Sequence, residues 1–282
     1  LHFTIHSFPT RRSSDLTPFA QVPTHHGGNY MYLVSDLDSN SWPQTPRNEA
    51  LRRIRKAHAY HLCGDQHLPM VLHYGIDDWE DAGEAFAVPA ICTGYPRWFH
   101  PKESLENTPS GAPSHIGRYV DGLGNEVTIR AVANPVETPF PDDLLERLAG
   151  KSSGYGILRI DKQAGTYTAE AWPLLSDPAD PETQFDRWPR TSSMAENYGR
   201  APAAHLPRIE VEGISNPAIQ VIDDETGEVL YPLRVRGTSF RPPVFSEGLF
   251  AVRVGDDAEW VHTEEKVETV PEDSDATITV GG

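Results

Sequence analysis

Residues 44–67 hold the feature that most constrains the fold: a helical stretch, a short apolar run and a turn follow one another directly. From Pro46, which suits a first helical turn, apolar residues recur at helical spacing among arginines. The small and apolar run 57–63 then predicts a buried strand that ends at Gly64. This order of helix, strand and turn is typical of α/β proteins, in which ligands bind beyond the carboxyl ends of strands. We therefore expect an α/β fold.

The turn Gly64-Asp65-Gln66-His67 presents a carboxylate and an imidazole two residues apart. Both groups bind Zn, Mn, Fe or Co, and a glycine lets the backbone turn sharply at the strand end. A Gly-Asp-x-His sequence also arises by chance as a capped turn with a surface histidine, so it does not identify a metal site alone. His61 and His73 lie nearby in the sequence, but neither spacing selects a metal.

The remainder of the chain predicts mostly short elements. Two hairpins, over 117–132 and 155–173, flank a short helix that ends at Gly150. Residues 174–207 are rich in Pro and Asp and predict a linker. Beyond them, alternating residues around a turn at 224–227 predict a small antiparallel β-domain, and the acidic end is expected to fray.

Composition excludes some classes of partner. The formal net charge of −17 argues against non-specific binding to nucleic acid or to an anionic membrane, because both need a basic face. No apolar stretch approaches the roughly 20 residues that a membrane span requires. The two cysteines, Cys63 and Cys92, both lie in apolar surroundings, which predicts two buried free thiols. The oligomeric state stays open.

Residues 6–16, HSFPTRRSSDL, show neither a helical nor a strand period. They resemble the conceptual translation of a common short-read sequencing adapter, and the alternative is an ordinary flexible tail. We therefore expect 1–16 to be an artefact and the natural protein to continue upstream of Thr17.

The series from Asp36 to Trp98, DLDSNSWPQTPRNEALRRIRKAHAYHLCGDQHLPMVLHYGIDDWEDAGEAFAVPAICTGYPRW, resembles the C-terminal part of alkaline phosphatase D-like proteins, of the calcineurin-like metallophosphatase superfamily. The resemblance continues through VTIRAVANP, GYGILRIDKQAGTYTAEAWP and NPAIQVIDDETGEVLYPLRVRGTSFRPPVF and covers most of 18–255. The order of these blocks is more specific than any one of them.

The resemblance implies the C-terminal part of a sandwich of mixed β-sheets with flanking helices, with two metal ions at the strand ends. The superfamily's last metal motif is commonly Gly-His-x-His, and this branch has Asp in place of the first His, as in residues 64–67. It implies His67 as a metal ligand and Asp65 as a ligand or as a carboxylate that orients one. Divalent or trivalent Fe, Mn, Zn or Ca ions are candidates, and the implied activity is hydrolysis of a phosphate ester by a metal-activated water.

Several side chains beyond the turn are further candidates. Arg97, Tyr95 and Trp98 have the chemistry to hold an anionic substrate, and the alternative is a cap of packed aromatic rings with a salt-bridged arginine. His25 and His26 could approach the same site but match no family ligand, and a solvated loop is the alternative.

The family's earlier ligand motifs belong upstream of Thr17. We therefore expect a C-terminal fragment that lacks a complete active site and is inactive alone, from a protein that is exported if its missing N-terminus carries a signal. The expected divisions are an artefact (1–16), the metallophosphatase part (17–205), the β-domain (206–265) and the acidic tail (266–282). The competing hypothesis is a non-catalytic β-rich binding or cell-envelope module in which GDQH is a structural turn.

Overall fold

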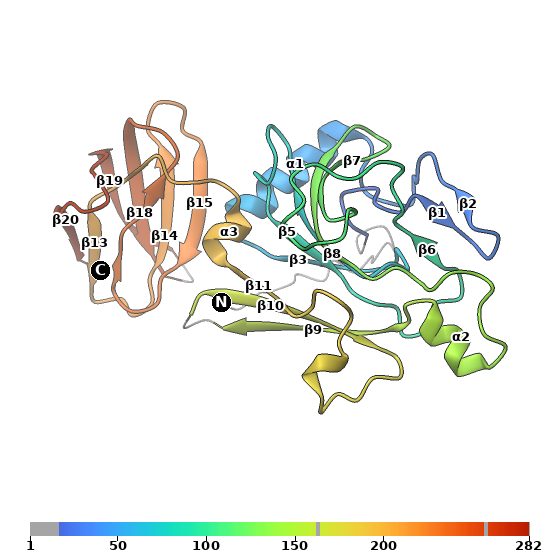
Figure 1. The fold of residues 1–282 in the computed structure, drawn as a ribbon. Helices are drawn as coiled ribbons and strands as arrows, with labels where there is room; N and C mark the ends of the chain where they lie inside the picture. Colours follow the sequence, from blue (N-terminus) through green and yellow to red (C-terminus); the bar gives the residue numbers. More distant parts are fainter. Residues whose placement is uncertain (1–16, 162–163, 257–258, 282) are drawn as a thin grey trace. The chain divides into compact units, whose positions relative to one another are not determined.

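The structure, a computed structural model, describes residues 17–161, 164–256 and 259–281. These residues form two compact units, shown in Figure 1. The first unit comprises 17–54 and 59–199, and the second comprises 55–58 and 200–281. The expected artefact at 1–16 lies outside the described residues.

A five-stranded sheet, in the order β3-β5-β4-β8-β7, is the centre of the first unit. Its strands are β3 (His61–Cys63), β4 (Met70–Tyr74), β5 (Glu84–Ala87), β7 (Gly117–Val120) and β8 (Glu126–Val132). Only the pair of β3 with β5 is parallel within this sheet. The predicted turn between β7 and β8 is confirmed, because the Asp121 carboxylate accepts hydrogen bonds from the backbone of Leu123 and Asn125, each at 2.9 Å.

The two faces of this sheet are covered differently. Successive strand residues point to opposite faces, so Met70 packs with Leu51 of helix α1 (Gln44–Lys56), whereas Val71 packs with Ala171 on the other face. The helix predicted over this stretch is thereby confirmed. The sheet lies between a helical layer and a second sheet.

That second sheet has the order β11-β10-β9, with β9 (Gly154–Asp161), β10 (Thr166–Pro173) and β11 (Arg190–Ser193). Helix α3 (Met194–Tyr198) follows β11 directly, and a 3-10 turn covers Pro181–Thr183. The stretch 174–207, expected to be a linker-like boundary, is only partly one: β11 pairs with β10 inside the first unit, but the division between the two units does fall within this stretch, after Gly199.

A three-stranded sheet at one end of the first unit has the order β2-β1-β6. Its strands, β1 (His25–His26), β2 (Met31–Tyr32) and β6 (Arg97–Trp98), contain two residues each. The predicted short helix is α2 (Leu144–Gly150), whose first turn is capped by the Asp143 side chain. These short elements bring residues that are distant in the sequence next to the GDQH turn.

The second unit is built from strands. They are β12 (Ala204–His205), β13 (Arg208–Glu212), β14 (Ala218–Asp223), β15 (Val229–Arg234), β16 (Ser239–Phe240), β17 (Pro243–Val244), β18 (Leu249–Gly255), β19 (Trp260–Glu268) and β20 (Thr277–Gly281). The turn predicted at 224–227 joins β14 to the antiparallel β15. The end of the chain, expected to fray, instead contributes β20, which pairs in parallel with β13.

The expectation of an α/β fold is wrong. The structure is β-rich, with 36% of residues in strands and 11% in helices, in six small sheets. The α-helices of the described residues have 13, 7 and 5 residues, and most neighbouring strands are antiparallel. The predicted buried strand at 57–63 is only the three-residue edge strand β3, in which Leu62 is half exposed. A single helix followed by a short edge strand does not make a βαβ architecture.

Both cysteines are free, but only Cys63 is buried, and Cys92 is exposed, contrary to expectation. Burial raises the pKa of the Cys63 thiol, which keeps it protonated and unreactive. Among the described residues, no helix is both long and apolar enough to cross a membrane.

Candidate functional site

The GDQH turn has an unusual backbone. Asp65 and His67 have φ angles of 62° and 52°, in the left-handed region that residues with a Cβ rarely adopt. Gln66 between them is buried, whereas Asp65 is exposed and His67 is half-buried. The turn therefore directs its middle side chain inward and leaves the other two accessible. Strain of this kind is often found at functional sites.

A backbone carbonyl fixes the His67 ring. Its Nδ1 lies 2.7 Å from the carbonyl oxygen of Tyr95. Because a carbonyl can only accept a hydrogen bond, Nδ1 carries the proton and the lone pair of Nε2 is left for another partner. Histidines that bind metals are commonly oriented in this way. Asp65 is exposed, and it forms no side-chain hydrogen bond or ion pair within the described parts of the chain.

Arg97 forms a salt-bridged contact with the segment that precedes helix α1 and with the GDQH turn. Its guanidinium forms ion pairs with Asp36 and, at 3.2 Å, with Asp38, and it donates a hydrogen bond of 3.3 Å to the side-chain oxygen of Gln66. Its side chain is 11% exposed. Of the two alternatives for Arg97, the geometry favours the salt-bridged arginine, because its terminal nitrogens are already engaged.

His26 and His67 both contact Tyr95, at its hydroxyl and at its backbone carbonyl respectively. The Tyr95 hydroxyl lies 2.5 Å from Nδ1 of His26, while the carbonyl of the same residue binds His67. The pairing of His26 with Arg97 in the β1–β6 ladder sets this arrangement. Sequence reasoning considered Tyr95 only as a substrate contact, and nothing in the local sequence reveals that it joins two histidines.

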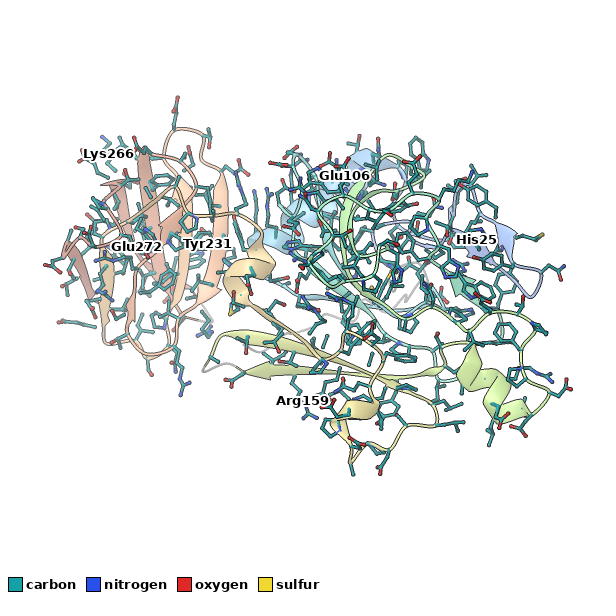
Figure 2. The ribbon with its side chains drawn as sticks, in the orientation of Figure 1. His25, Glu106, Arg159, Tyr231, Lys266 and Glu272 are labelled. Carbon is teal, nitrogen blue, oxygen red and sulfur yellow. The ribbon has the colours of Figure 1, made fainter. Side chains whose placement is uncertain are left out.

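The remaining candidate histidines lie away from the turn. His25, labelled on β1 in Figure 2, stacks on the Tyr30 ring with centroids 4.3 Å apart. Its pKa is lowered by partial burial and then by the nearby charge of Lys102. His61 binds the Tyr74 hydroxyl at 2.9 Å, and His73 is buried in the central sheet. None of these three contacts the GDQH residues through a hydrogen bond.

The charges near the turn are mixed. Asp36 and Asp38 are ion-paired with Arg97, Asp65 is exposed, and Nζ of Lys151 donates a hydrogen bond of 3.0 Å to the carbonyl of Gly94, next to Tyr95. Carboxylate and imidazole are suitable ligands for Zn, Mn or Fe. However, the described residues contain no group of three or more His, Cys, Asp or Glu side chains placed to hold a metal. Asp65 and His67 thus fit part of one coordination sphere and not a two-metal centre.

A comparison of the chain with protein-family models, with curated protein sequences and with solved structures found no match.

Proposed function

We propose that this chain carries part of the metal site of a metal-dependent phosphoric ester hydrolase, with His67 as a metal ligand. The observation that supports this most is the orientation of the His67 ring, whose Nδ1 donates to the Tyr95 carbonyl and whose Nε2 has no hydrogen-bond partner among the residues that the structure describes. The resemblance of residues 64–67 to the family's last metal motif supports the same role.

A metal held in part by His67 would supply an acidified water as the nucleophile for the phosphate ester. The residues of the chain position the ligand. Gln66, held by Arg97, anchors the turn from inside, and the two aspartates that pair with Arg97 fix that anchor. Asp65 either binds the metal or orients a ligand. The other ligands would come from sequence outside the described residues, so the present chain is proposed to be inactive alone.

The test is hydrolysis of a generic phosphate monoester by the present chain and by a longer chain in which residues 1–16 are replaced by the sequence that precedes Thr17 in its gene. We expect no activity above a metal blank for the first and metal-dependent activity for the second. In the longer chain, His67→Ala should lower activity strongly. Asp65→Ala should lower it by about 10–100-fold if Asp65 acts through another ligand.

The matched control is His205→Ala, in the second unit, which should keep full activity. If the longer chain with both Asp65→Ala and His67→Ala stayed fully active at limiting metal, the turn would be structural. The competing non-catalytic module would then be favoured. The contacts of Arg97 with Gln66 and Asp36 are compatible with that structural role as well.

A further inference from the structure

A second candidate site lies in the first unit, in a cavity of about 240 Å³. Four arginines line it, namely Arg118, Arg130, Arg187 and Arg190, together with one acidic residue, Glu80. No residue of the GDQH turn lines this cavity, and neither does Arg97. Figure 2 shows His25, on β1, well apart from Glu106, whose backbone pairs with Arg118.

The floor of the cavity belongs to a row of polar residues across the central sheet. Arg118 on β7 pairs with Thr128 on β8, Thr128 pairs with His73 on β4, and His73 pairs with Glu84 on β5. Residues directly opposite each other on neighbouring strands share a face of the sheet. Arg118 and Thr128 both line the cavity. The Thr128 hydroxyl is buried and has no hydrogen-bond partner in the described structure. Buried hydroxyls normally have one.

Most of the positive charge in the cavity is not neutralised. Arg130 pairs with Glu80 at 2.7 Å. In contrast, no carboxylate within the described residues forms an ion pair with Arg118, Arg187 or Arg190. This is notable in a chain with 41 acidic and 24 basic residues, in which carboxylate partners are plentiful.

The neighbouring contacts hold these guanidiniums in place without neutralising them. Arg118 lies over the Trp79 ring, 5.1 Å from its centroid, and the Nε of Arg187 donates to the Arg130 carbonyl at 3.2 Å. The pKa of Arg190 is lowered by burial and then by the charges of Arg187 and Arg130. Like charges that repel one another in a half-buried site favour an anion between them.

The nearby side chain of Glu84 offsets the excess of positive charge in the cavity only in part. Its carboxylate accepts a hydrogen bond from Ser192, and burial raises its pKa, which favours the neutral carboxyl. His73 beside it has its pKa lowered by burial, so its ring stays neutral near pH 7. Asp186 is exposed and adds one further negative charge close to Arg187 in sequence.

We propose that this cavity binds a phosphate group, as inorganic phosphate or as the phosphate of a small monoester. Planar guanidinium groups match phosphate oxygens with paired hydrogen bonds, and the Thr128 hydroxyl supplies a further donor. The volume lies below the roughly 300–1,000 Å³ typical of pockets for drug-sized ligands, so the ligand is small. This proposal does not rest on the hydrolase proposal, because the two sites share no residue.

The test is calorimetric titration of the full chain with inorganic phosphate, glycerol 3-phosphate and malonate, at constant ionic strength set with NaCl. We expect saturable binding of both phosphates at one site per chain and at least tenfold weaker binding of malonate. Arg190→Gln and Arg118→Gln should each weaken phosphate binding about tenfold or more. Arg53→Gln, an exposed arginine of α1 paired with Glu49, is the control and should change affinity less than about twofold.

A second measurement separates a binding role from a structural one. In phosphate-free buffer, Arg190→Gln should raise the thermal midpoint, because it removes repulsion, and should abolish the rise that phosphate causes in the wild type. His67→Ala should leave phosphate binding unchanged, which keeps this test separate from that of the hydrolase. Any of three results would overturn the proposal: malonate binds as tightly as phosphate, Arg53→Gln weakens phosphate binding as much as Arg190→Gln does, or Arg190→Gln lowers the thermal midpoint in phosphate-free buffer.

Discussion

Single buried side chains of the first unit determine part of its response to pH. His73 is 2% exposed, and neither ring nitrogen has a partner in the described structure. Its pKa is lowered to about 3, first by burial and then by Arg130. The unfolded chain takes up a proton on this ring below about pH 6.5, but the folded chain does not until about pH 3. The neutral His73 ring therefore contributes fully to the stability of the fold above about pH 6.5. This contribution is lost as the pH falls towards 3.

We expect His73→Leu to reduce this loss, because leucine does not titrate. Between pH 6.5 and 5, the free energy of unfolding of the wild type should fall by about 2 kcal/mol more than that of the variant. Urea unfolding at pH 8, 6.5 and 5 measures it, and pH 8 serves as the baseline at which both side chains are neutral. An equal fall in the two proteins would show that the His73 ring is protonated in the folded state.

Among the helices and strands, helix α3 is the one whose formation is most clearly explained by contacts between neighbouring residues. The Ser193 hydroxyl accepts a hydrogen bond of 3.1 Å from the backbone of Glu196, whose carboxylate accepts one of 2.7 Å from the backbone of Ser193. This capping box satisfies two backbone donors at the helix start. The helix ends at Gly199, whose φ of 74° suits glycine.

We expect Ser193→Ala to lower the free energy of unfolding by about 1 kcal/mol, because it removes one of these bonds. Ser110→Ala is the control, since Ser110 is exposed and forms no hydrogen bond in the described parts of the chain. Chemical denaturation of both variants measures the difference. Equal stability of the two variants would mean that the cap does not hold α3.

Local sequence predicted the elements that local contacts stabilise. The turns near Asp121 and at 224–227 are made by neighbouring residues, and helix α1 follows from its own spacing of apolar residues. Strand β11 was missed because its pairing with β10 closes a loop that the sequence presents as Pro-rich and irregular. Strand β3 was overestimated because an apolar run does not distinguish an edge strand from a central one.

The candidate sites can likewise be divided into residues that the local sequence predicts and residues that only the fold brings together. Asp65 and His67 are visible in the sequence because they lie in one turn. The Tyr95 carbonyl that orients His67 and the partners of Arg97 come from segments 28 or more residues away. The polar row on the central sheet depends on strand register, which no single segment specifies.

At the level of the whole chain, the two units should respond differently to phosphate. The arginine-lined cavity lies entirely in the first unit. Hydrogen exchange with and without phosphate should therefore show increased protection in β7, β8 and residues 187–190, and no change in 200–281. Equal protection of both units would indicate general stabilisation by the salt rather than binding at this cavity.

The whole-chain account depends most on whether His67 binds a metal. The chain has 12 histidines, whose ring signals can be followed by nuclear magnetic resonance while Mn²⁺ is added. We predict that the His67 ring signal broadens at the lowest Mn²⁺ concentration and that Asp65→Ala weakens the effect. Two results together would contradict a metal site at this turn: the His67 signal broadens only when the signals of exposed histidines also broaden, and Asp65→Ala leaves this broadening unchanged.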